Sequence, residues 1–354
     1  MSAVRIGSVC TGYGGLDAAV QEVFGGSLAW VADNDPGASR ILAHHHPRVP
    51  NLGDITAVRW EDVEPVDILC GGYPCQPFSL AGELKGTADA RHIWPFIARA
   101  LGVLRPRVAV FENVANHLRL GFDTVLCDLA DLGFDVEWCV VRADADDVGA
   151  PHQRRRLVFL ATAQDADGTA RDQRRFAAPG QAEERGARPD AGRRGRVAIA
   201  DTDGDAVRQQ PVSELGRDGA TVVEPARSHA AADTNSDRRE EQQRRESGVG
   251  ARGDSDRRGP ERWGRFAPAI ARWEAVTGRR APWATDDRGR LSPAFVEWMM
   301  GLAPGHVTAV PGLSRAAQLK ALGNGVLPQQ AVAALRLMTN GTEQDRGRGA
   351  GVAA

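Results

Sequence analysis

The sequence predicts an α/β protein with a mostly parallel sheet that is covered by helices on both faces. Two observations support this fold class. Between residues 4 and 163, short apolar runs alternate with amphipathic stretches of helical periodicity, which is typical of parallel strands joined by crossover helices. Glycine-rich or acidic residues directly follow several of these runs, and sheets of this class bind ligands outside the carboxyl ends of their strands.

The predicted elements have the lengths expected of strands and helices. The apolar runs that predict strands lie at residues 4–10, 27–32, 66–70, 108–111, 136–142 and 157–161. Helical patterns lie between them, including those at residues 16–24, 93–104 and 124–132. Because strands and helices alternate throughout, we expect residues 1–163 to form one domain.

The composition changes abruptly near Gln164. From there to about Arg262 the chain is rich in Arg, Asp, Gly, Gln and Glu and has almost no aromatic residues. Such a segment cannot build an apolar core, so we expect a hydrophilic, partly disordered insertion over about residues 165–260. Three Asp-rich stretches within it form a degenerate repeat, but none has the Gly and Glu positions of a calcium-binding EF-hand loop.

Ordered structure is predicted again after the insertion. Apolar residues recur there at helical spacing, namely Trp263, Phe266, Ile270, Trp273 and Val276. A compact segment follows at residues 291–302, and a Gly-Asn-Gly motif at 323–325 precedes a helical run that ends near residue 338. We expect residues 339–354 to be a flexible tail.

Charge and cysteine content narrow the class of protein. The formal net charge is −2, so the chain is not a generally basic nucleic-acid binder. Nearly all its positive charge is arginine, which favours bidentate phosphate and guanine contacts, although a GC-rich genome explains that content at least as well. Five cysteines without a CxxC pair argue against a disulfide framework or a zinc site. With no apolar run that could span a bilayer, we expect a cytoplasmic protein without membrane attachment.

A glycine-rich turn follows the first predicted strand. Gly12, Gly14 and Gly15 permit a tight turn and close approach of a ligand, and the helix that follows offers free N–H groups. Asp33 follows the second strand, where nucleotide-binding sheets place an acid that holds ribose hydroxyls. Asp54 is suited to a similar part near an adenine amino group. Packing glycines and a solvated Asp remain the alternative interpretation.

The most specific motif is GGYPCQPFS at residues 71–79, directly after an apolar run. Its Cys75 lies in a polar loop rich in Gly and Pro, at the strand end where substrates bind. A thiol attacks as the thiolate, and this setting makes Cys75 a candidate nucleophile. Cys70 ends the apolar run itself and is expected to belong to the core.

Glu112 and Asn113 end another apolar run. A Glu in this place is costly to bury unless it is paired or takes part in chemistry. A protonated carboxyl group can bond to a base nitrogen and supply the proton that activates a ring. Glu112 is therefore a candidate general acid.

A basic motif, PHQRRR at residues 151–156, leads into the last predicted strand. Alternate side chains of an extended segment point the same way, so His152, Arg154 and Arg156 are expected to share a face. A basic run is usually a solvated surface, but one that enters an apolar strand is a candidate part of a binding site.

Together these motifs resemble the cytosine-C5 DNA methyltransferase family of bacterial restriction–modification systems and phages. The resemblance covers residues 4–163 and 285–338, with the PCQ, ENV and GNG elements in the family's order. It implies a Rossmann-like S-adenosylmethionine-dependent methyltransferase fold with a small inserted target-recognition domain. Residues 1–163 would be the catalytic and cofactor-binding domain, 164–290 the target-recognition region, and 291–338 the C-terminal motifs that return to the catalytic domain.

The resemblance also implies roles for single residues. The implied catalytic residues are Cys75, Glu112, Arg154, Arg156, Pro74 and Asn113. Cys75 would be the nucleophile and Glu112 the partner of cytosine N3, whereas Arg154 and Arg156 would hold the flipped base and its phosphate. Asn113 would support the catalytic loop. The residues implied to bind S-adenosylmethionine are Gly12, Tyr13, Gly14, Gly15, Leu16, Asp33, Asn34, Asp54, Ile55, Asn324 and Gly325.

Several positions depart from the family's usual residues. Cys10 stands where most members have a Phe that stacks on the cofactor adenine, and Asp33 replaces a longer Glu. Gly325 replaces the Ser of the commoner GNS motif. The arginine motif has two alignments, QRR at 153–155 or HxRxR at 152–156, and the second preserves the spacing to the strand. These departures affect the expected cofactor affinity and the alignment of the arginine motif. Neither Cys75 nor Glu112 is among them.

The implied partner is double-stranded DNA, with no metal and no membrane. A cognate restriction endonuclease would act separately, and we expect a monomer. An RNA (tRNA) cytosine-C5 methyltransferase and a catalytically silent DNA-binding homologue remain alternatives. A dinucleotide-dependent oxidoreductase would explain the glycine turn and Asp33 but not Cys75, Glu112 and the arginines. The recognised DNA sequence does not follow from these residues.

Overall fold

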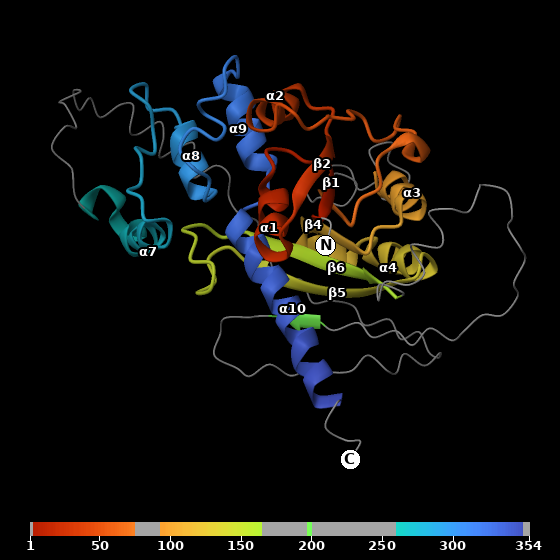
Figure 1. Cartoon of the computed structure of the whole chain (residues 1–354). Coiled ribbons are helices and arrows are strands. Elements are labelled where there is room, and N and C mark those ends of the chain that lie inside the picture. Colours follow the sequence, from red (N-terminus) through yellow and green to blue (C-terminus); the bar gives the residue numbers. More distant parts are fainter. Residues whose placement is uncertain (1–2, 75–92, 165–196, 200–259, 350–354) are drawn as a thin grey trace, which may run out of the picture. The chain divides into compact units, whose positions relative to one another are not determined.

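The computed structural model describes residues 3–74, 93–164, 197–199 and 260–349, with side chains for 3–74, 93–164 and 262–340. Contacts divide the chain into two units, Met1–Pro211 with Pro268–Ala354, and Val212–Ala267. In the second unit, the described residues form the 3-10 helix η5 (Pro260–Phe266), where the Arg262 guanidinium lies 4.1 Å from the centroid of the Trp263 ring. The sheet belongs to the first unit (Figure 1).

The sheet has the strand order β2-β1-β3-β4-β6-β5-β7. Its strands are β1 (Arg5–Val9), β2 (Ser27–Ala32), β3 (Ile68–Gly72), β4 (Val108–Val114), β5 (Phe134–Arg142), β6 (Arg155–Ala163) and β7 (Val197–Ile199). Strand β6 runs antiparallel to β4 and β5, and all other neighbours pair parallel. The predicted α/β fold with a mostly parallel sheet is therefore confirmed, and each predicted strand is present.

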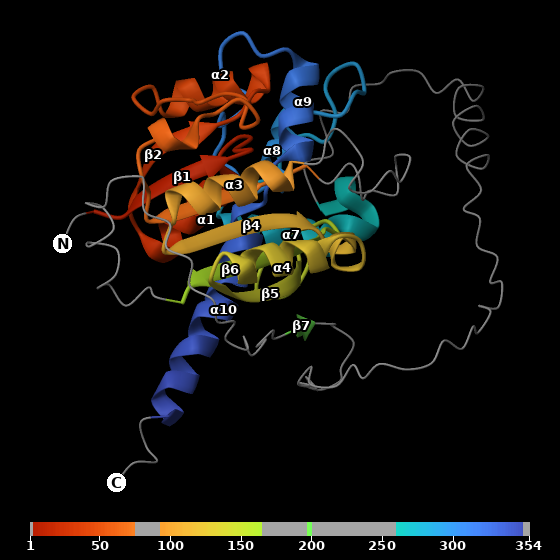
Figure 2. The ribbon, with the colours of Figure 1, turned by 90° about the vertical axis from the view of Figure 1, so that its right-hand side faces the viewer.

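Helices cover both faces of the sheet. The α-helices of the described residues are α1 (Gly15–Phe24), α2 (Pro36–His45), α3 (Trp94–Leu104), α4 (Phe122–Asp131), α7 (Ala267–Thr277), α8 (Pro293–Met299), α9 (Arg315–Asn324) and α10 (Pro328–Gly349). Two short 3-10 helices add to them, η1 (Trp60–Asp62) and η4 (Ala115–Arg119). Helices α1 and α10 pack together on one face, and α3 and α4 cover the other (Figure 2). Among the described residues, no helix is long and apolar enough to cross a bilayer.

The central strand β4 shows why the sheet is buried on both sides. The ring of Phe111 lies 5.8 Å from that of Trp94 and 5.4 Å from that of Phe159, between centroids. Val110, the preceding residue, is also fully buried. Because successive side chains of a strand point to opposite faces, Val110 packs on the side of α1 and α10. A strand buried on both faces reads as a continuous apolar run, as the sequence does here.

The C-terminal end of the chain differs from the expected tail. Helix α10 continues to Gly349, so residues 339–349 are helical, and residues 350–354 lie outside the described part. The first half of this helix is anchored in the core by buried Ala331, Leu335 and Met338. A helix that is already nucleated extends at little cost, which explains why the polar composition did not end it.

The predicted apolar helix face after the insertion is only partly buried. Ile270 and Trp273 are 5% and 0% exposed, whereas Phe266 and Val276 are 56% and 52% exposed. Gly264 has a non-helical backbone (φ 49°, ψ −129°) inside η5. This kink lies between Trp263 and Phe266, so the helical spacing of these two residues does not generate one continuous face.

A buried carboxylate organises the loop after α8. Glu297 is 2% exposed and accepts hydrogen bonds from three backbone N–H groups within residues 305–308, at 2.6–2.9 Å. The Thr308 hydroxyl donates to it as well, at 2.9 Å. His306, in the same loop, bonds through Nε2 to the carbonyl of Tyr13 at 2.8 Å. Glu297 therefore holds a loop that contacts the glycine-rich turn.

We predict that Glu297→Gln lowers the free energy of unfolding by about 3 kcal/mol. The amide nitrogen of Gln is itself a donor, and it would face N–H or hydroxyl groups that now donate to a carboxylate oxygen. Urea unfolding monitored by far-ultraviolet circular dichroism measures this change. The matched control is Glu22→Gln, which removes only an exposed ion pair with Arg336 and should cost less than about 1 kcal/mol. Equal stability of the two variants would contradict the assigned role of Glu297.

Candidate active site

The strand register brings the predicted catalytic motifs together. In the parallel pair of β3 and β4, Gly72 lies opposite Glu112. In the antiparallel pair of β4 and β6, Val114 lies opposite Arg156. The segment that leads to Pro74, the acid at the end of β4 and the basic motif before β6 therefore meet at one edge of the sheet.

A cavity of about 410 Å³ opens at the carboxyl ends of β1 to β4. Residues of the predicted catalytic set line it, namely Pro74, Glu112, Asn113, Arg154 and Arg156. Residues of the predicted cofactor set line the same cavity, namely Gly12, Asp33, Asn34, Asp54, Ile55 and Asn324. Cys75 follows Pro74 directly and lies outside the described residues. One cavity therefore joins most of both predicted sites.

The other predicted cofactor residues do not line this cavity. Tyr13 and Leu16 are buried, at 1% and 3% exposure. Gly14 has a left-handed backbone (φ 84°) and precedes α1, where the turn requires glycine. Gly15 and Gly325 pack tightly against the carbonyl of Val326 and the ring of Tyr13, respectively. These residues are packed inside the fold and do not contribute surface to the cavity.

Asp33 is held rigidly at one side of the cavity. Its Oδ2 accepts a hydrogen bond from the N–H of Gly12, and its Oδ1 accepts one from the N–H of Asp35, both at 2.8 Å. Burial raises the pKa of Asp33, and these two hydrogen bonds oppose that rise. Because each carboxylate oxygen retains a second lone pair, Asp33 can still accept a hydrogen bond from a ligand hydroxyl.

Asp54 and its neighbours complete this side of the cavity. The Oδ1 of Asp54 accepts hydrogen bonds from the N–H and hydroxyl of Thr56, at 2.9 and 2.8 Å. Its Oδ2 accepts one from Asn34 at 3.2 Å. Ile55 and Cys10 add less polar surface beside it. Acceptors for hydroxyl and amino groups next to apolar side chains suit a nucleoside; among the described residues, no cluster of His, Cys, Asp and Glu is placed to hold a metal ion.

Glu112 is the buried acid of the cavity, with 7% of its surface exposed. Its Oε1 lies 2.7 Å from Nε of Arg156, an ion pair without the angles of an ordinary hydrogen bond. Burial raises the pKa of Glu112, and the charges of Arg156 and Arg154 oppose this only in part. The protonated carboxyl is therefore more favoured here than in water.

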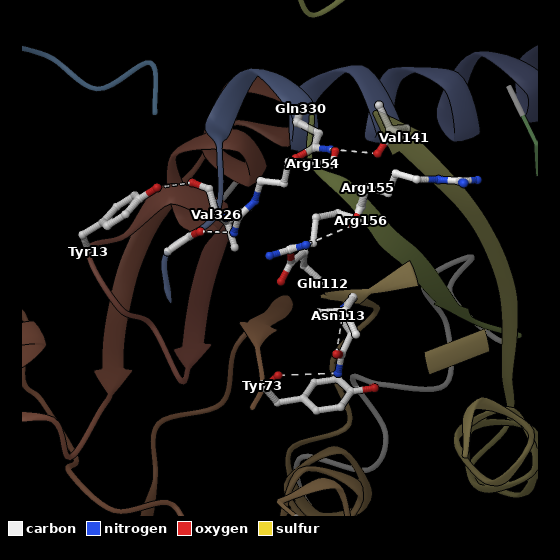
Figure 3. A network of polar contacts seen from close by, with 12 residues as sticks. Tyr13, Tyr73, Glu112, Asn113, Val141, Arg154, Arg155, Arg156, Val326 and Gln330 are labelled. Atoms are coloured by element: carbon white, nitrogen blue, oxygen red, sulfur yellow. Dashed lines mark hydrogen bonds and ion pairs between the residues drawn. The ribbon is translucent and has the colours of Figure 1, made fainter. Parts of the chain in front are cut away.

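The basic motif presents Arg154 and Arg156, but not Arg155, to the cavity (Figure 3). A guanidinium nitrogen of Arg154 donates to the carbonyl of Gly325, and Arg156 pairs with Glu112. Both side chains come from the same face of the extended chain, as the alternating alignment predicts. His152 does not line the cavity, and burial lowers its pKa to about 4, so it is neutral near pH 7.

Asn113 and Tyr73 fix the segment that leads to Pro74. The Asn113 amide donates to the carbonyl of Tyr73 at 3.5 Å. The Tyr73 hydroxyl meets Nε2 of His117 at 2.7 Å, and Nδ1 of His117 meets the carbonyl of Leu120 at 2.9 Å. Because a carbonyl only accepts, Nδ1 carries the proton, and Nε2 of a neutral His117 accepts from Tyr73. The chain just before Cys75 is thus anchored on β4 and η4.

Sequence reasoning missed an ion pair at the rim of the cavity. Lys320 of α9 pairs with Asp35, which also caps α2 by accepting from the N–H groups of Gly37 and Ala38. The hydrogen bond to Lys320 is the main cause of the lowered pKa of Asp35. The capping role could have been found, because an Asp followed by Pro is a helix-start signature. No local signal connects residues 285 positions apart.

The described cysteines near the site are poor nucleophiles. Cys10 lines the cavity, but burial, with the charges of Asp33 and Asp54, raises the pKa of its thiol to about 12. Cys70 is fully buried and donates to Asp17 at 3.1 Å, and its pKa is also raised, mainly by burial. Cys70 is therefore a core residue, as its place in the apolar run predicts.

Comparison with known proteins places the chain in a family. Residues 4–250 match the model of the C-5 cytosine-specific DNA methylase family. The chain belongs to this family. Its sheet and the motif order, from the glycine turn to the basic motif, agree with that membership.

Relatives with names and solved structures support the same family and fold. A Type II methyltransferase, M.HgiBI of Herpetosiphon aurantiacus, is 30% identical over 47% of this chain and 39% of its own. Another, M.NlaIV of Neisseria lactamica, is 34% identical over 36% of this chain and 32% of its own. The chain thus spans less than half the length of these curated relatives. The S. pombe Dnmt2 methyltransferase has a similar fold, with a TM-score of 0.53, 14% identity, and coverage of 93% of this chain and 97% of its own. The Rossmann-like methyltransferase fold is confirmed.

The substitution of Cys10 tests whether the cofactor adenine lies in this cavity. The usual Phe would add an aromatic face where Cys10 lines the cavity. We predict that Cys10→Phe tightens S-adenosylhomocysteine binding about fivefold, because stacking on a base contributes roughly 1 kcal/mol or more. Cys10 already has a left-handed backbone (φ 51°), so the variant and the wild type share that strain.

Isothermal titration calorimetry measures this affinity, with Cys10→Ser as the control of similar size and no ring. Unchanged or weaker binding by Cys10→Phe would show that the adenine does not lie against this residue.

Proposed function

We propose that the protein transfers a methyl group from S-adenosylmethionine to carbon 5 of a cytosine that is flipped out of double-stranded DNA, through a covalent adduct with Cys75. The observation that carries this proposal is the shared cavity: the buried carboxyl of Glu112, flanked by Arg154 and Arg156, faces the same space as Asp33 and Asp54. A nucleoside cofactor and a pyrimidine that both bound in this cavity would be within reach of each other.

S-adenosylmethionine would be held by groups of fitting chemistry. Asp33 would accept hydrogen bonds from ribose hydroxyls, and Asp54 would accept one from the adenine amino group. Ile55 would pack on the adenine, and the bare backbone at Gly12 leaves room beside it. When bound, the cofactor supplies an electrophilic methyl group.

The protein's own groups would make carbon 5 nucleophilic. The Cys75 thiolate adds to carbon 6, and the ring electrons move toward N3, where protonated Glu112 supplies a hydrogen bond or the proton. The enamine-like carbon 5 would then take up the methyl group that the bound cofactor supplies, with S-adenosylhomocysteine as the leaving product. Loss of the C5 proton to water, return of the N3 proton to Glu112 and expulsion of the Cys75 thiolate would restore the aromatic ring. Pro74 lines the cavity and directly precedes Cys75, and Asn113 bonds to the carbonyl of Tyr73 in the same segment.

Arg154 and Arg156 would stabilise the flipped base. Unstacking a base costs a few kcal/mol, so groups that bind the extruded nucleotide lower the barrier. Guanidinium groups bond strongly to phosphate and to the base carbonyl, and the phosphate share of binding should weaken with salt. Residues 164–290, with the hydrophilic insertion at about 165–260, are proposed to choose the target sequence; most of this region lies outside the described residues.

Transfer of labelled methyl groups from S-adenosylmethionine into duplex DNA and into tRNA tests the proposal. We expect incorporation into duplex DNA only, as 5-methylcytosine. Incorporation into tRNA alone would favour the RNA methyltransferase alternative. No incorporation into either, together with retained DNA binding, would identify a catalytically silent homologue. Bisulfite sequencing of a methylation-free host that expresses the protein would then give the target sequence.

A further inference from the structure

One short segment lies between the glycine-rich turn and the basic motif. It consists of Gly325 and Val326, which directly follow α9. The Tyr13 hydroxyl donates to the carbonyl of Val326 at 2.7 Å, and this hydrogen bond is buried. A guanidinium nitrogen of Arg154 donates to the carbonyl of Gly325 (Figure 3). Two adjacent carbonyl groups thus connect the turn after β1 to the arginine before β6.

The packing around this segment leaves little freedom. A Cβ atom on Gly325 would lie 1.8 Å from a ring carbon of Tyr13, and a Cβ atom on Gly15 would lie 2.1 Å from the carbonyl oxygen of Val326. Neither position can carry a side chain unless its neighbour moves. Tyr13 therefore occupies the space that the common Ser of the GNS motif would need, which explains the Gly at position 325 in this chain.

Arg154 is held from a second side. Gln330 of α10 donates from Nε2 to the carbonyl of Arg154 at 2.8 Å and to that of Val141 at 2.7 Å. The backbone of Arg154 is thereby tied to α10, while its side chain is tied to Gly325. Its guanidinium still lines the cavity. The direction of this side chain depends on where the Gly325–Val326 segment lies.

We propose that Tyr13 is a positioning residue that couples the two halves of the cavity: its hydrogen bond to Val326 holds the segment that orients Arg154. Cofactor bound at the glycine-rich turn then favours the Arg154 geometry that binds the flipped base. By thermodynamic linkage, the flipped base strengthens cofactor binding by the same factor as the cofactor strengthens base binding. This inference rests on the proposed function, since it needs both ligands to share the cavity.

Tyr13→Phe isolates the contribution of the hydroxyl, because the ring that packs on Gly325 is kept. The matched control is Tyr73→Phe, since the chain has just two tyrosines. Tyr73 also donates a buried hydrogen bond, but to His117. Melting temperatures of both variants report whether they fold.

The experiment measures, by fluorescence anisotropy, the Kd of a duplex carrying the target sequence found by bisulfite sequencing, with and without saturating S-adenosylhomocysteine. In the wild type we expect S-adenosylhomocysteine to tighten DNA binding about tenfold. Tyr13→Phe should reduce this ratio to below about twofold, while its Kd for S-adenosylhomocysteine alone stays within about twofold of the wild type. Tyr73→Phe should keep the wild-type ratio.

A wild-type ratio near one would overturn the inference, as would a full ratio in Tyr13→Phe or an equal loss in Tyr73→Phe. Failure of the proposed function is recognised separately. In that case bisulfite sequencing detects no methylated cytosine, so no target sequence is found from which to make the duplex. If Tyr13→Phe melts at too low a temperature to be used, Gly325→Ser tests the same segment from the other side. Its added side chain clashes with the Tyr13 ring, so S-adenosylhomocysteine should no longer tighten DNA binding. The double variant Tyr13→Ala/Gly325→Ser removes the clash but also lacks the hydroxyl, so the tightening should stay absent. A ratio restored by that double variant would show that packing alone matters.

Discussion

Replacing Cys75 by alanine is expected to reduce methyl transfer by at least about 1000-fold, since deletion of a covalent nucleophile removes the reaction path itself. Without addition to carbon 6, carbon 5 of cytosine stays a poor nucleophile. Cofactor affinity should remain within about twofold of the wild type, because none of the groups proposed to hold S-adenosylmethionine is altered. Single-turnover transfer of labelled methyl groups, with parallel calorimetry of S-adenosylhomocysteine, measures both quantities.

The control for this experiment is the cysteine that lines the same cavity. Cys10 is a poor nucleophile because burial and two nearby carboxylates raise its pKa to about 12. Cys10→Ser should therefore retain most of the wild-type rate. If methyl transfer persists in Cys75→Ala but is lost in Cys10→Ser, the nucleophile is Cys10 and not Cys75.

The second large effect is expected at Glu112. Glu112→Gln should lower the rate of methyl transfer by about 100- to 10,000-fold, the range that positioned general acids contribute. The amide fills the same space but cannot donate a proton to N3. The matched control is Glu22→Gln, which neutralises an exposed carboxylate and should leave the rate unchanged. A normal rate of methyl transfer by Glu112→Gln would show that Glu112 does not act as the acid.

The pH dependence follows from the environment of Glu112. Burial raises its pKa, and the protonated form is the one that serves as acid. The rate should therefore be high below that raised pKa and fall as pH rises through it, on a limb above the ordinary glutamate value of about 4.3. Glu112→Gln should lack this limb. The same shift makes the stability contribution of buried Glu112 greatest at low pH and lost as pH rises through the raised pKa.

The sheet and its ligand-binding edge could be predicted from sequence because local signals were strong. The run that ends at Phe111 is apolar on both faces and is followed at once by Glu112, which lies two residues before the end of β4. The register of β3 against β4 then placed Gly72 opposite Glu112. Proximity of the two motifs follows from the adjacency of β3 and β4; alternation of strands and helices predicts a parallel sheet but not its strand order.

Other features depended on contacts that no local pattern reveals. The alternating arginine register could be read from strand geometry, but the bond from Arg154 to Gly325 spans 171 positions. Tyr13 and Leu16 lie within the glycine-rich motif and yet are buried and do not line the cavity: Leu16 is a buried residue of the first turn of α1, and Tyr13 packs on residues 325–326. The Asp35–Lys320 pair likewise arises from tertiary packing, and residues 339–349 continue a helix whose first half is buried.

In the proposed reaction, Cys75 joins the cavity and attacks a cytosine held by Glu112. Duplex DNA in which the target cytosine is replaced by 5-fluorocytosine tests it most directly, since fluorine at carbon 5 blocks the final elimination. After incubation with S-adenosylmethionine, peptide mass spectrometry should find the nucleotide attached to the Cys75 peptide of the wild-type protein, and no adduct with Cys75→Ala. Attachment at Cys10, or methylation of unmodified DNA without any trapped adduct, would contradict the account.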